Sequence, residues 1–285
     1  MLFGVTMRRV GVGAGLVLVW WLVAFLPSTR QVAGTPLEFA AILPLYPSAW
    51  ATLLVWTAVA GAVVGLVLWR TGGTWVDVAA VVVASAVLVG VIGWVWFDRH
   101  LPEEGYYLRD DRVVAFGLGL YVLGATVGLA LGALAVRGLP TAVPALVVVA
   151  WAAGTWLSSL FGADPLALAD TVAGRPWSWW FGLLAVAATG VVAGRIRAWV
   201  WAVLGGALVM LAQVASISLS NVSVLIRPPI AAELVDEAWA RVTGILPVWL
   251  RTSYPWEPLI ALAIGVVVGL VLRSQRRGEE PVSTQ

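Results

Sequence analysis

The chain alternates between long apolar stretches and short polar segments. Apart from Glu257, at the edge of the last stretch, every charged residue lies outside the apolar stretches. A charge at the centre of a bilayer costs roughly 2.5–3.5 kcal/mol, and a helix of about 20 apolar residues crosses its hydrocarbon core. The pattern therefore predicts an all-α fold, a polytopic integral membrane helix bundle of about eight transmembrane helices. The expected spans are 10–27, 50–69, 78–97, 113–136, 142–161, 177–194, 198–218 and 255–272.

These spans predict a single transmembrane domain over residues 1–274. In the largest loop, residues 229–246 place apolar side chains every four positions and charges mostly opposite, which predicts an amphipathic helix on the outer membrane surface. Residues 275–285 are polar and predict a disordered cytoplasmic tail. Two arginines precede the first span, as in a signal peptide. Its apolar run is longer than that of a usual signal peptide, so we expect this span to be retained in the protein.

The placement of arginines sets the expected orientation. With the N-terminus inside, the inner segments carry nine arginines and three acids, and the outer segments carry eight arginines and twelve acids. The inner loops are short and place arginines directly at helix ends, where positive charge determines orientation most strongly. We therefore expect a multi-pass protein of the cell membrane with both termini in the cytoplasm.

A glycine motif recurs in the four spans that run from outside to inside. Each has two glycines four residues apart, followed within five residues by an arginine. Glycines at this spacing flatten a helix face, so that a neighbouring backbone can approach closely. The recurrence also suggests hairpin repeats of the same orientation. The alternative is that the motif recurs by chance in a glycine-rich chain. The candidate helix-packing residues are Gly61, Gly65, Gly128, Gly132, Gly190, Gly194, Gly265 and Gly269.

Few polar side chains lie within the spans. Thr155, Ser158 and Ser159 share one face of the fifth span, and Gln213 and Ser216 lie at comparable depth in the seventh. Such residues either make hydrogen bonds between helices or line a route for a small neutral or zwitterionic solute. We take these five residues as a candidate polar pathway.

The densest polar cluster is the outer loop over residues 98–112. Its acids and its histidine offer oxygen and nitrogen ligands for a cation, but three arginines nearly neutralise them and the spacing matches no metal-binding loop. A solvated loop held by ion pairs is the simpler interpretation. If the loop instead docks a partner or binds a cation, the candidate residues are His100, Glu103, Glu104, Asp110 and Asp111.

Composition narrows the possible chemistry. Hydrophobic residues make up 61% of the chain and charged residues 11%, against about 25% charged in typical soluble domains. The chain has no cysteine and one histidine, which excludes thiol nucleophiles, thiolate metal sites and a multi-histidine metal or haem site built from this chain alone. We expect no catalytic residues, no resident cofactor or metal, and no nucleic-acid partner.

Three functions remain compatible with the sequence. The first is a permease-like or channel-like component that moves a small or lipidic solute. The second is a non-catalytic scaffold or assembly subunit of a larger membrane complex, and the third is an intramembrane enzyme that uses the outer carboxylates on lipid-linked substrates. Spans without charged residues at membrane depth argue against a proton-coupled carrier acting alone. Expected partners are the lipid bilayer, other membrane subunits and, for a permease, a separate ATPase.

Overall fold

The structure is a computed structural model. It describes residues 15–25, 43, 45, 49–100, 111–161, 171–172, 175–225, 240, 243–244, 247–248, 250–251 and 256–278.

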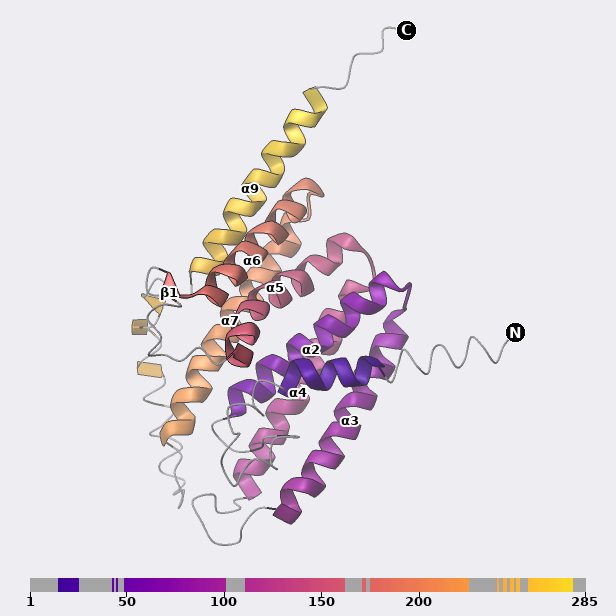
Figure 1. Ribbon diagram of the computed structural model, residues 1–285, viewed down its shortest axis with the longest axis vertical. Coiled ribbons are helices and arrows are strands. Elements are labelled where there is room, and N and C mark those ends of the chain that lie inside the picture. Colours follow the sequence, from indigo (N-terminus) through magenta and orange to yellow (C-terminus); the bar gives the residue numbers. More distant parts are fainter. Residues whose placement is uncertain are drawn as a thin grey trace, which may run out of the picture.

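Helices make up almost all of the described chain, and each follows one of the predicted apolar stretches. A helix over Gly15–Phe25 covers part of the first stretch. The others are α2 (Trp50–Arg70), α3 (Trp75–His100), α4 (Asp111–Ala135), α5 (Leu139–Phe161), α6 (Trp177–Arg195), α7 (Trp199–Leu225) and α9 (Glu257–Gly278) (Figure 1).

Six of the described helices are long and apolar enough to cross a membrane. Gly15–Phe25 and Trp179–Arg195 are shorter apolar segments. Many large side chains on the helix surfaces are exposed, such as Leu184 at 70%. Monomeric soluble proteins rarely expose apolar patches this extensive, so the surface suits lipid rather than water. The six spans are Trp50–Arg70, Trp75–Val95, Val114–Ala135, Leu139–Leu157, Trp199–Ser220 and Glu257–Gln275.

The first two glycine motifs pack against each other. Gly61 of α2 faces Gly128 of α4, and Gly65 faces Gly132 one turn further along both helices, so α2 and α4 run parallel. A Cβ atom added at Gly61 would lie only 2.5 Å from the carbonyl carbon of Gly128, closer than real Cβ atoms approach. The two backbones are therefore in direct contact, as the flat glycine faces predict.

The other two motifs form a second couple of the same kind. Gly190 and Gly194 of α6 face Gly265 and Gly269 of α9, again in parallel. A Cβ atom at Gly190 would lie 2.5 Å from the carbonyl oxygen of Leu262. The glycine motifs thus join helices that are not consecutive in the chain, whereas the predicted hairpins would group consecutive ones.

Helices α5 and α7 lie between the two couples. Both contact α2 on one side and α6 on the other. The core next to α2 and α4 includes an aromatic cluster, in which Trp20 meets the rings of Phe25 and Tyr121 edge-on at centroid distances of 5.8 and 5.9 Å. Around α5 the core consists mainly of alanine and valine, which lets the helices approach closely.

Short turns connect the helices at the end of the bundle where α2, α4 and α6 finish. The turn before α3 is closed by Thr74 and Asp77, because the Asp77 carboxylate accepts hydrogen bonds of 2.7 and 2.8 Å from the backbone N–H and hydroxyl of Thr74. The turns after α4 and α6 span residues 136–138 and 196–198. Such tight connections place each pair of consecutive helices antiparallel.

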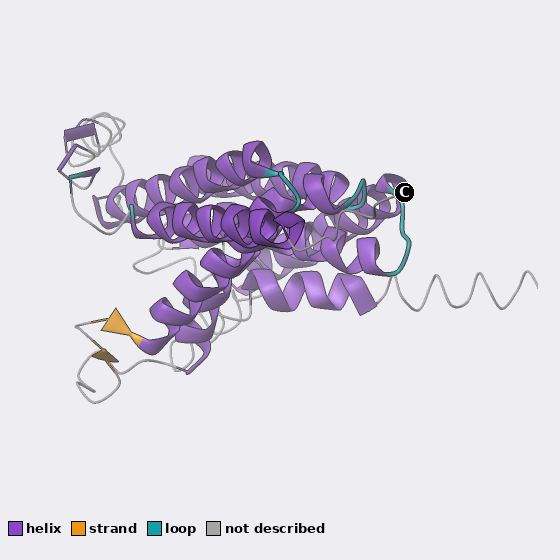
Figure 2. Ribbon diagram, turned by 90° about the horizontal axis from the view of Figure 1, so that it is seen from above, coloured by secondary structure: helices purple, strands orange, loops and turns teal. Residues whose placement is uncertain are grey.

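Two features differ from the sequence prediction or lie beyond it. A two-residue antiparallel pair, β1 (Thr171–Val172) and β2 (Arg175–Pro176), precedes α6 and lies beyond the helix ends (Figure 2). Helix α9 continues to Gly278 and so includes the first residues of the segment predicted as a disordered tail. Most of the amphipathic helix predicted at 229–246 lies outside the described residues.

Candidate functional site

A cavity of about 270 Å³ opens between four helices. We call it the tryptophan cavity, because three indoles form much of its wall. Its lining comes from α2, α5, α6 and α7, so it lies where the α2·α4 couple meets the rest of the bundle. The lining residues are Val55, Trp56, Trp151, Thr155, Trp179, Gln213, Ser216 and Ile217.

The cavity lies nearer the end of the bundle at which α2 and α6 begin. Trp56 is about 9 Å along α2 from Trp50, and Thr155 is about 9 Å before Phe161 at the end of α5, at 1.5 Å per residue. Gln213 lies deeper, about 18 Å before the end of α7. The wall therefore extends from near the helix ends toward the middle of the span.

Three of the five predicted polar-pathway residues meet at this cavity. Thr155 on α5 and Gln213 and Ser216 on α7 all line it. Ser158 and Ser159 belong to the last turn of α5, but their side chains lie outside the described part of the structure.

Two buried donors of the lining have no hydrogen-bond partner among the described residues. They are the amide nitrogen Nε2 of Gln213 and the indole nitrogen Nε1 of Trp151. Gln213 is only 7% exposed. A buried donor left unpaired costs about 1–3 kcal/mol, so a ligand that pairs with either nitrogen would recover part of that cost.

Other polar atoms at the cavity already have partners. The Thr155 hydroxyl donates to the carbonyl oxygen of Ala152 at 2.9 Å, so its oxygen is left as an acceptor. The indole N–H of Trp179 donates to the Oε2 atom of Glu257 at 2.7 Å. That bond ties the wall of the cavity to the first residue of α9.

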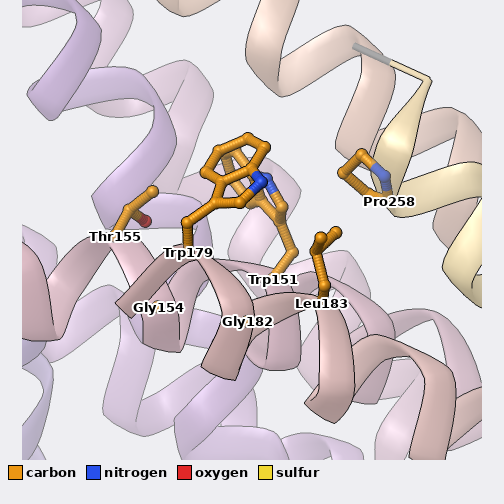
Figure 3. A pocket seen from close by; sticks show the side chains of 7 residues that line it. All are labelled: Trp151, Gly154, Thr155, Trp179, Gly182, Leu183 and Pro258. Atoms are coloured by element: carbon orange, nitrogen blue, oxygen red, sulfur yellow. The ribbon is translucent and has the colours of Figure 1, made fainter. Parts of the chain in front are cut away.

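A second, very small void adjoins the tryptophan cavity. It measures about 10 Å³, close to the space of a single water, and shares Trp151, Thr155 and Trp179 with the larger cavity. Figure 3 shows both indoles above α5 and α6, with Thr155 on one side and Pro258 of α9 on the other. The indoles have little free space on the side of α9, and the larger space lies toward α2 and α7.

The lining suits binding rather than acid–base chemistry. Among the described lining residues, none carries a charge or titrates near neutral pH. Amide, hydroxyl and indole groups orient a neutral ligand by hydrogen bonds, and the aromatic walls supply apolar contact.

The predicted outer docking or cation loop falls mostly outside the described residues. His100 ends α3 and Asp111 begins α4, but their side chains are not described, and Glu103, Glu104 and Asp110 lie in the gap between the two helices. Within the described chain, no three acidic or histidine side chains gather closely enough to hold a metal ion.

Sequence reasoning missed the tryptophans of the cavity wall. Tryptophan is common at both membrane surfaces, so this residue type does not by itself indicate a site. A signal was nevertheless available, because Trp56 and Trp151 lie inside the predicted spans 50–69 and 142–161 rather than at their ends. The bond from Trp179 to Glu257 has no counterpart in the sequence pattern.

Comparisons with protein-family models, with curated proteins and with solved structures find no match for this chain. Any proposal about its function therefore depends on the geometry described above.

Proposed function

We propose that this protein is a permease-like component of the cell membrane that takes a small or lipidic solute into the tryptophan cavity. The observation that carries the proposal is the meeting of Thr155, Gln213 and Ser216 at one cavity of about 270 Å³. Polar side chains that only join helices would be expected to pair with one another. Among the residues that the structure describes, the Gln213 amide nitrogen has no such partner.

The position of the cavity supports the same function. Carriers with internal repeats commonly bind their substrates between two sets of helices and open the site by moving one set against the other. Here the α2·α4 couple is held together by backbone contact, and so is the α6·α9 couple. The cavity lies where the first couple meets α5, α6 and α7, which is where relative movement would change access.

The orientation expected from the arginines places this cavity in the outer half of the membrane. The mouth would then face the outer surface, and the inner turns after α2, α4 and α6 would face the cytoplasm. An ATPase partner would dock at those inner turns, whose arginines include Arg70, Arg137 and Arg197.

Cysteine labelling tests the proposal, because the natural chain has no cysteine and needs no background removal. Ser216→Cys and Thr155→Cys place a thiol on the cavity wall, and Ser85→Cys places one at a fully buried position of α3. Thr71→Cys, in the exposed turn after α2, is the positive control for inverted vesicles. The reagent is a charged, membrane-impermeant methanethiosulfonate.

We expect the Ser216 and Thr155 variants to react in intact cells, and to a lesser extent in inverted vesicles, while the Ser85 variant stays unmodified. A scaffold needs no water-accessible cavity. If neither cavity variant reacts in either preparation while the Thr71 variant does in vesicles, the permease proposal is wrong and the scaffold is favoured.

A further inference from the structure

The unpaired groups of the tryptophan cavity indicate what kind of molecule it receives. The Gln213 amide and the Trp151 indole come from different helices, α7 and α5, and each brings a donor without a partner among the described residues. The indole N–H of Trp179 and the hydroxyl proton of Thr155 are already engaged. Both nitrogens are buried just behind the cavity surface, so a ligand that pairs with them must supply an acceptor, and the two side chains must turn toward it.

The amide of Gln213 can present its donor to the cavity. Gln213 is more than nine-tenths buried and forms part of the cavity lining. The two ends of a glutamine amide have nearly the same shape, and rotation about the last side-chain bond exchanges oxygen and nitrogen. A ligand oxygen at the wall would select the rotamer that points the N–H toward it.

The rest of the wall restricts charge and size. No described lining residue is charged, and an ion without a counter-charge is costly to bury. The indoles, Val55 and Ile217 provide an apolar surface. A cavity of roughly 150 Å³ accommodates benzene, so about 270 Å³ suits a molecule or headgroup portion of roughly ten non-hydrogen atoms.

We propose that the tryptophan cavity binds a neutral, largely apolar molecule through a carbonyl oxygen that accepts from the Gln213 amide and the Trp151 indole. This inference deepens the proposed function and rests on it for the role of the cavity. The carbonyl can come from two sources: the acyl ester of a membrane lipid, or a free carbonyl compound that enters from water or from the bilayer.

Matched small probes test the ligand class. Cyclohexanone and methylcyclohexane have the same number of non-hydrogen atoms, but only cyclohexanone has an acceptor. Binding of each is measured by saturation-transfer NMR on the full chain in phosphatidylcholine nanodiscs, with empty nanodiscs subtracted. We expect the wild type to prefer cyclohexanone about tenfold, as one well-placed hydrogen bond allows. Gln213→Leu should remove most of that preference, because only the Trp151 donor remains, and Gln275→Leu, at the exposed far end of α9, should retain it.

Trp151→Phe is the second variant, in case Gln213→Leu does not fold, and it should lower the preference several-fold. The proposal is overturned if the wild type shows no preference for cyclohexanone in discs of dialkyl-ether phosphatidylcholine, which contain no lipid ester, or if both variants keep that preference. Nanodiscs of diacyl and of dialkyl-ether phosphatidylcholine separate the two sources. A lipid ester that occupies the cavity should weaken cyclohexanone binding in the diacyl discs only, whereas a free carbonyl ligand predicts equal binding in both.

The two proposals can fail separately. A probe preference that depends on Gln213, together with unreactive cavity cysteines, would keep the ligand class and reject the permease. Reactive cavity cysteines without a probe preference would keep the permease and reject the ligand class.

Discussion

Arg197 has a backbone conformation that its residue type does not predict. Its φ of 59° is left-handed, and it follows α6 at the position where Gly72, with φ 75°, follows α2. In both turns the next N–H bonds back to a carbonyl five residues earlier: Ala198 to Ala193 at 2.8 Å and Gly73 to Leu68 at 2.7 Å. Glycine normally ends a helix this way, so the sequence signals the turn at Gly72 but not the one at Arg197.

Replacing Arg197 with glycine should stabilise the protein. The left-handed conformation costs a residue with a side chain roughly 1–2 kcal/mol, which glycine avoids. Part of this gain is lost because glycine is more flexible in the unfolded chain. We expect Arg197→Gly to increase the free energy of unfolding by about 0.5–1 kcal/mol, seen as a higher melting temperature in detergent. Gly72→Ala, the reverse change, should lower it, and equal melting temperatures for both variants would contradict the account.

For the single helices, the sequence revealed the glycine faces but not their partners. Two glycines four residues apart show that a helix has a flat side. They do not show which of the other flat sides it meets, because all four motifs look alike. The pairing depends on the whole bundle, which places α4 rather than α3 against α2 and α9 rather than α7 against α6.

A bulky side chain on a glycine face should separate the helices of a couple. A Cβ atom at Gly65 would collide with the backbone of Gly132, and rigid backbone cannot move aside cheaply. We expect Gly65→Val to lower the free energy of unfolding by about 2–3 kcal/mol, by analogy with overpacked cores. Gly190→Val should act similarly on the α6·α9 couple. Thermal unfolding in one detergent compares them.

Gly119, on the same helix as Gly132, provides the matched control. A Cβ atom there would meet nothing within 4 Å. Gly119→Val should therefore leave the melting temperature almost unchanged. If Gly119→Val and Gly65→Val destabilise equally, helix propensity rather than backbone contact explains the loss.

The residues of the tryptophan cavity were predictable from the sequence only in part. Polar residues in an apolar span stand out, so Thr155, Gln213 and Ser216 were found from the sequence, and the structure brings them to one cavity. The apolar part of the wall does not stand out, because valine, isoleucine and tryptophan also face lipid in such proteins. Only the arrangement of four helices distinguishes Val55 and Ile217 from lipid-facing neighbours.

For the whole molecule, the alternation of helices predicts where the chain ends lie. Parallel couples between α2 and α4 and between α6 and α9, joined by tight turns, fit a chain whose direction reverses at each helix. Eight spans with both ends in the cytoplasm remain the expected topology. A fluorescent protein fused after Gly278 should fluoresce, and alkaline phosphatase fused after Phe161 should be active. If alkaline phosphatase fused after Gly278 is active, the C-terminal end lies outside and the expected orientation is wrong.

The class of fold was easier to derive than the packing of the molecule. The segregation of charge from apolar stretches has one main physical cause, the cost of charge in lipid, and the helices from α2 onward follow the predicted stretches closely. Packing depends instead on shape, which the sequence encodes through scattered small residues. One is Gly182 of α6, where an added Cβ atom would lie 3.4 Å from the carbonyl oxygen of Trp151. Such contacts have no local signature.

The two couples also determine the order in which helices can pair during synthesis. Because α2 pairs with α4, and α6 with the last helix, each first member enters the membrane before its partner has been translated. At about 5–20 residues per second, the glycine groove of α6 stays open to lipid for several seconds. A chain that stops short of Glu257 never fills that groove. Membrane proteases, which recognise unassembled helices, would then determine how long such a truncated product survives.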